Sequence, residues 1–257
     1  MFSDWKQTVY SVKDEIQKQK YLTAACLLWF ILCTWWGTWN NFEINEFYGY
    51  ETCTADLLIG QQGGTYVGLT IFPFAAFLFM KCKRNSLNVQ YLLRYGSRGR
   101  MFRRQIMESS VYTLGISVFL LLIQILFSSV KCSSLINWEK EESYYCMLTG
   151  VPAEGNFFLV LGAVFLMYLV KFMIVLTFLD ILLWYPRYLF VLWVLLVAAA
   201  GAAWLAELDL LYELFGFWWK EWTQPVQYGG QVLIGVLIIS VEYLTGIGLI
   251  REKDVFQ

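Results

Sequence analysis

The 257-residue sequence contains no histidine and neither of the common nucleotide-phosphate loops. Histidine is the commonest general base and a frequent metal ligand, so its absence leaves hydrolytic or metal chemistry without its usual residue. A GxxxxGK[ST] run and a GxGxxG run ahead of a helix are both missing, so the chain has no phosphate cradle of its own. We therefore expect no catalytic residue, metal or cofactor in this chain, and any ATP must bind to another chain.

Charge is also scarce. Only 15% of the residues are charged, against about a quarter in soluble domains, while 58% are hydrophobic and the mean hydropathy is +0.53. Uncharged runs of about 20 apolar residues have the length that crosses a ~30 Å hydrocarbon core. We expect an all-α integral membrane protein. This excludes a soluble enzyme domain and a disordered chain, and the net charge of −1 excludes a nucleic-acid binder.

Six apolar runs are long enough to span a membrane. They cover residues 21–39, 63–80, 106–130, 157–178, 188–206 and 230–250. The first run is too long for a cleaved signal peptide and has no small-residue cleavage site, so we expect it to remain in the mature protein. The prediction is a single transmembrane domain over residues 1–257.

Lysine and arginine are divided unevenly among the predicted loops. Sixteen of the 19 fall before the first span, between spans two and three, around spans four and five, or after span six. The opposite side holds Lys131, Lys140 and Lys220 and collects twelve acidic residues. Short cytoplasmic loops carry the excess of basic residues, so we expect both termini to be cytoplasmic.

Two terminal or outer segments are amphipathic without being spans. Residues 3–20 place Trp5, Val9, Val12 and Ile16 on one helical stripe, which predicts an elbow helix in the inner membrane interface or, alternatively, a solvated helical tail. Residues 208–225 are too apolar for a free loop. They predict either a partly re-entrant helical hairpin or a helix lying flat in the outer interface.

The loop between spans two and three combines arginines with a short amphipathic pattern. An apolar and aromatic stripe at four-residue spacing predicts a helix over 85–95, after which Ser97 can cap the next helix. Such a helix suits docking to a cytoplasmic partner, whereas the arginines alone suit a loop that only sets topology. The residues concerned are Leu87, Tyr91, Leu92, Arg94, Tyr95, Arg98 and Arg100.

Three charges fall inside predicted spans, and two outer cysteines bracket one loop. Burying Glu108, Lys171 or Glu242 costs at least ~2.5 kcal/mol each, so they are expected to avoid lipid. Lys171 either snorkels to the interface or joins Glu108 or Glu242 in a cluster that lines a vestibule. Cys132 and Cys146 face the side where a disulfide persists and are candidates for one.

The order of these elements resembles the permease subunit of a type V ABC exporter. The resemblance rests on residues 5–16, on residues 208–225 and above all on Asn85-Ser-Leu-Asn-Val-Gln-Tyr-Leu-Leu-Arg-Tyr-Gly-Ser-Arg-Gly-Arg100. The Leu-Arg-Tyr-Gly-Ser-Arg run is similar to the loop in permeases of bacteriocin or lantibiotic export and immunity systems.

The resemblance implies a bacterial cytoplasmic membrane protein that forms half of a transport pathway. Its partners would be a second permease chain, identical or related, and an ABC ATPase subunit that binds ATP and Mg. The helix over 85–95 would be the coupling helix that docks into the ATPase. The cargo implied is a peptide or an amphipathic, drug-like molecule.

Two other functions compete with export. One is a non-transporting immunity or sensor protein that binds a toxic peptide through its acidic outer loops. The other is a channel or an ion-coupled carrier, which is disfavoured because the acids lie near one face and no inverted repeat is evident.

Overall fold

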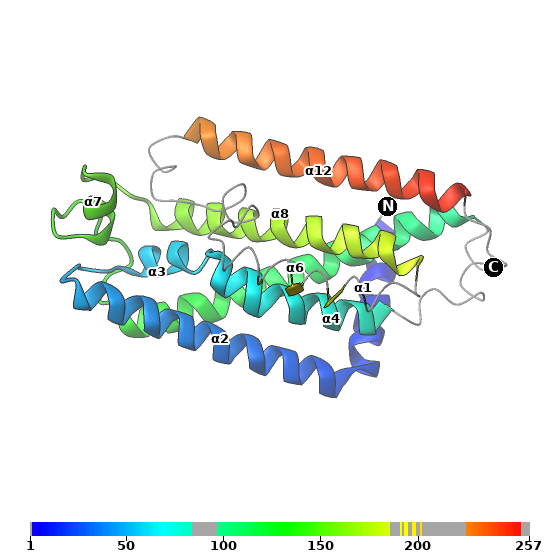
Figure 1. Cartoon of the computed structure of the whole chain (residues 1–257), viewed down its shortest axis with the longest axis horizontal. Coiled ribbons are helices and arrows are strands. Elements are labelled where there is room, and N and C mark those ends of the chain that lie inside the picture. The colour runs from blue at the N-terminus through cyan, green and yellow to red at the C-terminus, as the bar shows by residue number, and fades with distance from the viewer. Residues whose placement is uncertain are drawn as a thin grey trace.

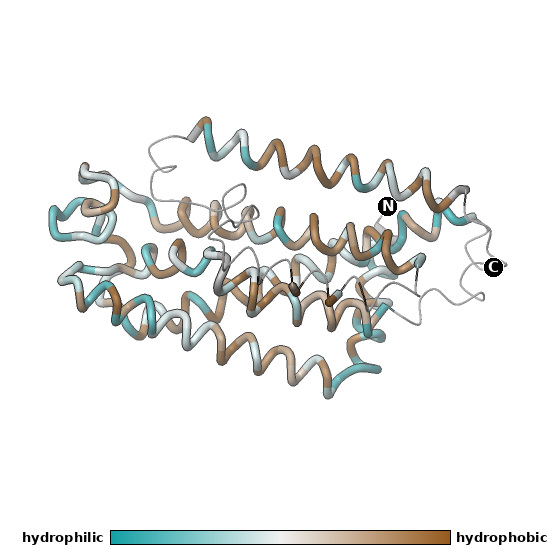
Figure 2. Tube along the Cα trace, in the orientation of Figure 1, coloured by the Kyte–Doolittle hydropathy of each residue, from teal (hydrophilic) through white to brown (hydrophobic). Residues whose placement is uncertain are grey.

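The computed structural model is a bundle of long, roughly antiparallel helices (Figure 1). It describes residues 2–83, 97–185 and 225–252 and six helical positions between 191 and 201. In these parts of the chain the elements are all helical, and the β structure is one isolated bridge between Glu51 and Ser143. Figure 2 shows hydrophobic residues along the lengths of the long helices.

In the part of the chain that the structure describes, nine helical elements have the following bounds. They are α1 (Phe2–Lys18), α2 (Lys20–Phe47), α3 (Thr54–Gly60), the π-helix η1 (Gly64–Ile71), α4 (Phe72–Lys83), α6 (Arg98–Lys131), α7 (Tyr144–Thr149), α8 (Phe157–Leu183) and α12 (Pro225–Glu252).

Five helices of the described chain are long and apolar enough to cross a membrane. They are Lys20–Phe47, Tyr66–Lys83, Arg98–Lys131, Phe157–Leu183 and Val226–Ile250. Each coincides with a predicted span, which confirms the multi-pass membrane character of the chain. The predicted span over 188–206, the helix over 85–95 and nearly all of segment 208–225 lie outside the described residues.

Several helices are longer than their apolar runs. α2 continues eight residues past the predicted end at Trp39, and α6 begins eight residues before Ile106. Hydropathy locates the segment that crosses lipid, whereas the helix continues until its backbone is capped. At the start of α6 the predicted cap is present, because Ser97 Oγ accepts a hydrogen bond from the Arg100 backbone N–H at 3.4 Å.

α1 packs against α4 and α6 at one end of the bundle (Figure 1). The sequence predicted a stripe of Trp5, Val9, Val12 and Ile16, but Trp5 and Val9 are about 40% exposed. Val12 is buried and Ile16 packs against the core, as the stripe predicts, but Thr8 is buried in place of Trp5 and Val9. The buried face is therefore turned partly away from the predicted stripe, and the physical reason is a polar contact of Glu15 with the bundle, described below.

α8 lies at the centre of the packing and contacts α4, α6 and α12. Gly246 allows α12 to approach closely, because a Cβ there would meet Phe102 Cζ at 2.5 Å and Ile181 Cγ1 at 3.0 Å. The far side of α12 is exposed, with Leu233, Leu237 and Leu244 each more than half exposed. Such an apolar face is expected to meet lipid or another membrane helix.

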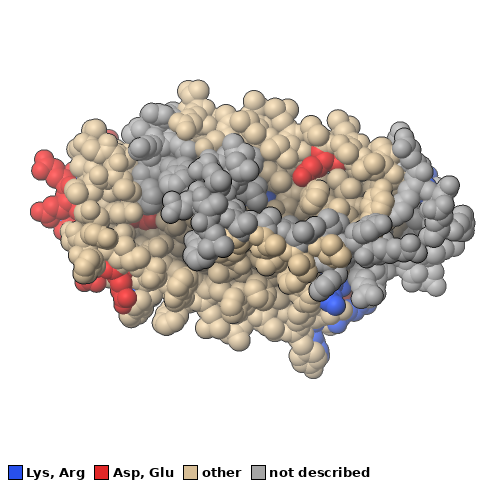
Figure 3. Space-filling view, in the orientation of Figure 1, with Lys and Arg blue, Asp and Glu red and all other residues tan. Residues whose placement is uncertain are grey.

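Charge is separated along the bundle. Acidic atoms gather at the end that carries α3 and α7, whereas basic atoms gather near α1 (Figure 3). α8 ends and α12 begins at opposite ends of the bundle (Figure 1). The predicted fifth span, 188–206, falls in the interval of sequence between them, where Trp193 Nε1 donates to the Pro73 carbonyl at 3.1 Å.

Candidate functional site

One face of α6 carries a line of buried polar side chains. Its members are at most 2% exposed and mostly four residues apart, which places them on the same side of the helix. They are Gln105, Ser109, Thr113, Ser117, Gln124 and Ser128. Leu120 interrupts the line, so the polar residues form two groups, one toward α1 and one toward the opposite end.

The group nearer α1 is completed by an ionic network, which we call the α1-side cluster: Glu15, Lys83, Arg104, Glu108 and Asp180. Lys83 Nζ lies 2.7 Å from Glu108 Oε2, and Arg104 Nε lies 3.2 Å from Glu108 Oε1. Lys83 Nζ also donates to the Gln105 carbonyl at 3.2 Å. Because Lys83 is fully buried and Glu108 is 4% exposed, this pairing offsets the cost of removing both charges from water.

Asp180 enters the same cluster from α8. Its side chain is fully buried, and its Oδ2 is hydrogen-bonded to Ser109 Oγ of α6. Next to it, Trp184 Nε1 donates to Gln105 Oε1 at 2.9 Å. These contacts join α8 to α6 at the level where Lys83 joins α4 to α6.

Glu15 brings α1 into the cluster. Tyr112 Oη donates to Glu15 Oε2 at 3.1 Å, and the Tyr112 ring packs edge-on against Phe79 at 5.5 Å between centroids. Burial raises the pKa of Glu15 from 4.5 to about 7, although the positive charge of Lys83 opposes this effect.

The raised pKa of Glu15 predicts that α1 binds the bundle more weakly as the pH rises. A detached Glu15 releases its proton near 4.5, whereas the docked residue holds it up to about 7, so docking is strongest below 4.5 and weakens through 7. A nitroxide label at the exposed position of Lys13→Cys should become more mobile across this range. In Glu15→Gln the mobility should not depend on pH; equal pH dependence in both proteins would contradict the assignment.

The second group lies deeper in the bundle, and we call it the central cluster: Thr34, Tyr66, Gln124, Tyr168, Gln62 and Lys171. Tyr66 Oη is hydrogen-bonded to Thr34 Oγ1, and Gln124 Nε2 donates to Tyr168 Oη at 2.5 Å. Lys171 Nζ donates to the carbonyl and to Oε1 of Gln62 at 3.2 and 3.1 Å. Four elements therefore meet through polar contacts in the interior of a membrane bundle.

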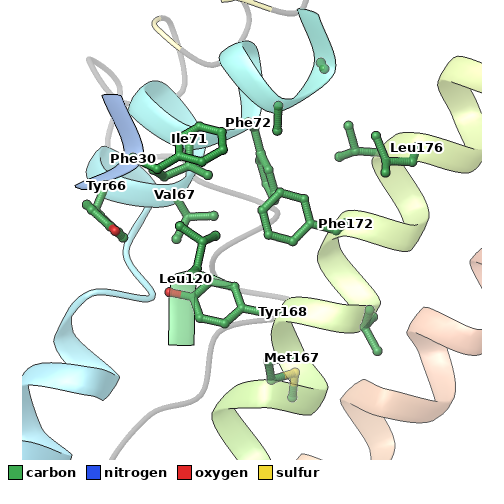
Figure 4. Packing of buried hydrophobic residues seen from close by; sticks show 14 of the residues in the cluster. Phe30, Tyr66, Val67, Ile71, Phe72, Leu120, Met167, Tyr168, Phe172 and Leu176 are labelled. Carbon is green, nitrogen blue, oxygen red and sulfur yellow. The ribbon is translucent and has the colours of Figure 1, made fainter. Parts of the chain in front are cut away.

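Between the two clusters along the helices lies an apolar layer made of Phe30, Ile71, Phe72, Leu120 and Phe172. Each of these residues is at most 4% exposed. Figure 4 shows these side chains close to Tyr66 and Tyr168 of the central cluster. Phe72 and Phe172 pack edge to face with centroids 5.0 Å apart. Along α6, Leu120 lies between Glu108 of the α1-side cluster and Gln124 of the central cluster. Along α8, Phe172 lies between Asp180 and Lys171. Along η1 and α4, Ile71 and Phe72 lie between Lys83 and Tyr66.

The end of the bundle opposite α1 carries a compact cap made of segments 48–62 and 132–156. Its centre is Asp56, whose Oδ1 accepts Trp138 Nε1–H at 2.9 Å and whose Oδ2 accepts the Cys53 backbone N–H at 3.1 Å. Trp138 is 1% exposed and stacks on Tyr145 with centroids 4.3 Å apart. Gly155 passes so close that a Cβ would meet Trp138 Cε3 at 2.8 Å.

The structure separates the three charges that the sequence placed near one another. Glu108 pairs with Lys83 and Arg104, whereas Lys171 contacts Gln62, so Glu108 and Lys171 do not share a cluster. Lys171 is 1% exposed and does not snorkel, because α8 runs on to Leu183 and leaves it twelve residues from the helix end. Glu242 is partly buried on α12, and its Oε2 has no hydrogen-bond partner among the described residues.

The six cysteines are all free thiols in this structure. The Cys132–Cys146 disulfide stays a prediction. The loop between them is held by other contacts: Asn137 Nδ2 donates to the Glu51 carbonyl at 3.0 Å, and Lys140 Nζ lies 2.6 Å from Glu51 Oε2.

Of the predicted coupling residues, Arg98 and Arg100 lie in the first turn of α6. The others, Leu87 to Tyr95, lie outside the described residues.

Most of this site was not predicted from the sequence. Lys83 was counted only among the basic residues between spans two and three, and Asp180 was not singled out. The four-residue spacing of polar residues in 105–128 was a usable signal, since such a line within an apolar run indicates a buried polar face.

No family model, curated protein or solved structure matches the chain.

Proposed function

We propose that this chain is the membrane permease subunit of an ATP-driven ABC exporter, moving a peptide or an amphipathic, drug-like molecule. The observation that carries the proposal is the pair of buried polar clusters on either side of one apolar layer. Polar groups inside a bilayer are costly and usually mark a pathway or a relay. A bundle that needed only stability would be expected to fill these positions with apolar residues.

This arrangement suits alternating access. If the layer of Phe30, Leu120 and Phe172 closes the path, then each polar cluster can open to its own side of the membrane in turn. A pathway for an amphipathic cargo needs both polar and apolar walls, and the clusters and the layer provide them in sequence.

The position of the α1-side cluster supports power from a separate ATPase. Lys83 is the last residue of α4, and α6 begins at Arg98, so the predicted coupling helix over 85–95 connects two elements that the Lys83–Glu108 pair joins. A push on that segment would act directly on this ion pair. We therefore assign ATP and Mg to a partner ABC ATPase and the other half of the pathway to a second permease chain.

The charge separation along the bundle supports a cytoplasmic location for both termini. Basic residues gather near α1, and acidic residues gather at the cap (Figure 3). By the positive-inside rule the α1 end faces the cytoplasm, in a bacterial cytoplasmic membrane. We propose that α1 then serves as the elbow helix and that segment 208–225 re-enters the outer leaflet.

The proposed coupling helix predicts that Tyr91→Ala combined with Leu92→Ala releases the ATPase. A buried aromatic anchor commonly contributes about 2 kcal/mol or more at an interface, so affinity should fall at least about thirtyfold. The measurement is co-purification of the proposed partner ATPase with the wild-type and mutant permeases. ATP-dependent transport should fall together with ATPase recovery.

Arg94→Ala is the matched control for this test. It removes a charge at the rim and should alter the salt dependence of binding more than its strength. Wild-type recovery of the ATPase and wild-type transport by the double mutant would mean that the loop only sets topology.

A second function, binding of a toxic peptide by an immunity or sensor protein, is favoured by the cap. Its hydrogen-bonded core around Asp56 and Trp138 is a built structure, and Glu139, Glu141 and Glu142 are exposed on it. Such a surface would hold a cationic peptide without transport. The two functions differ in whether the central cluster is reached from both sides of the membrane.

A further inference from the structure

We propose that Asp180 is a proton-binding site within the α1-side cluster and that it carries one proton in the conformation described here. The ligand is thus a hydrogen ion taken from water, held between α6 and α8. This assignment goes beyond export of an organic cargo, and it does not depend on which ATPase the chain binds.

Ser109 Oγ makes two hydrogen bonds with a single hydroxyl hydrogen. Its Oγ donates to the Gln105 carbonyl at 2.9 Å, a bond within α6, and is also hydrogen-bonded to Asp180 Oδ2. A serine hydroxyl has one hydrogen but can accept further hydrogen bonds. If that hydrogen is used on Gln105, the bond between Ser109 and Asp180 needs a hydrogen from the carboxyl group. A protonated Asp180 supplies it and donates to Ser109 Oγ.

The environment of the other carboxyl oxygen of Asp180 also favours the protonated form. Asp180 Oδ1 is buried and has no hydrogen-bond partner among the described residues. An ionised carboxylate requires several donors to offset its burial, whereas a neutral carboxyl group loses much less when one acceptor goes unused. The side chain is 0% exposed, so bulk water does not supply the missing donors.

The charged groups around Asp180 favour the protonated form as well. The charged groups of the described chain that act on Asp180 are Lys83 of α4 and Glu108 of α6. Lys83 is already within 2.7 Å of Glu108, whose other oxygen is held by Arg104. Among the described residues, Lys83 is the cation that acts on Asp180, and it already pairs with Glu108. A neutral Asp180 therefore does not need to share the positive charge of Lys83.

Buried hydroxyl groups continue from the site along α6 and α8. Thr177 on α8 and Thr113 and Ser117 on α6 are buried, and each has a hydroxyl without a hydrogen-bond partner among the described residues. Successive positions four residues apart on a helix rise by about 6 Å, close to two hydrogen-bond lengths, so one water molecule can bridge each step. Buried waters typically occupy such places.

Infrared difference spectroscopy of the full chain in lipid nanodiscs at neutral pH tests the proposal. The difference between wild type and Asp180→Asn should contain the C=O stretching band of a carboxylic acid. Glu139→Gln, at an exposed position of the cap, is the matched control, and its difference spectrum should lose carboxylate bands without losing that acid band. Loss of only carboxylate bands in Asp180→Asn would overturn the proposal, since it would mean that Asp180 is ionised and shares the Ser109 hydrogen.

Ser109→Ala keeps the test decisive if Asp180→Asn does not fold. Removing the hydroxyl that accepts the acid proton should shift the frequency of the acid band while keeping its area. An unchanged acid region together with a shift of carboxylate bands would contradict the proposal. Size-exclusion chromatography of each variant shows that the spectra come from monodisperse protein.

Discussion

Replacing Lys83 by methionine is expected to destabilise the bundle by about 3 kcal/mol, because Glu108 then loses its closest cation while remaining buried. Breaking a buried ion pair by removing one partner typically costs about 3–5 kcal/mol. Arg104 still contacts Glu108 at 3.2 Å, which places the expected loss at the lower end. The measurement is the free energy of unfolding in mixed micelles.

The double variant Lys83→Met with Glu108→Gln separates charge from shape. Both side chains keep about the same size, and neither charge of the pair remains. It should be more stable than Lys83→Met alone, since no unpaired carboxylate is left. The pair does not organise this end of the bundle if Lys83→Met is as stable as the wild type. The same conclusion follows if the double variant is less stable than Lys83→Met.

Replacing Trp138 by alanine is expected to open the cap. The residue is 1% exposed, stacks on Tyr145 and donates its indole N–H to Asp56. Truncation of a buried tryptophan to alanine costs about 3–5 kcal/mol. Amide hydrogen exchange in residues 51–60 should therefore accelerate by about a hundredfold or more.

Two comparisons distinguish the hydrogen bond from packing in the cap. Trp138→Phe keeps an aromatic ring but leaves Asp56 without the indole donor, so its effect should be smaller, about 1–3 kcal/mol. Trp36→Ala, at a position on α2 that is 52% exposed, should leave exchange in 51–60 unchanged. Equal exchange in Trp138→Ala and wild type would mean that the cap does not depend on this contact.

The sequence was sufficient to locate the five long apolar helices of the described chain. Apolar runs and sparse charge located α6, α8 and α12, and Ser97 located the start of α6, because lipid and an uncapped helix end impose strong local rules. The π-helix η1 and the short helix α3 were not predicted. Hydropathy does not distinguish i→i+5 from i→i+4 hydrogen bonding, and α3 is fixed by Asp56 and its distant partner Trp138.

The site was much less predictable than the fold. Glu108 was recognised as buried, but its partner Lys83 lies 25 residues away at the end of another helix. Asp180 and Ser109 are 71 residues apart, and Gln124 and Tyr168 are 44 apart. Pairings of this kind follow from how helices rotate and cross, which the hydropathy pattern of a single helix does not fix. Lys171 illustrates the same point, since its partner Gln62 is an uncharged residue just before η1, whereas the sequence suggested an acidic partner on another helix.

The most direct test of the account asks whether ATP changes the side from which the bundle interior is reached. Along α6, Ser117 precedes the layer residue Leu120 on the side of Glu108, and Gln124 follows Leu120. In membranes containing the chain and its ATPase, with the native cysteines replaced, an impermeant thiol reagent should reach Ser117→Cys from the α1 side without ATP. When ATP binding is trapped, labelling of Ser117→Cys from that side should fall, and labelling of Gln124→Cys from the cap side should rise. Identical labelling of both positions with and without ATP would contradict a pathway through this bundle.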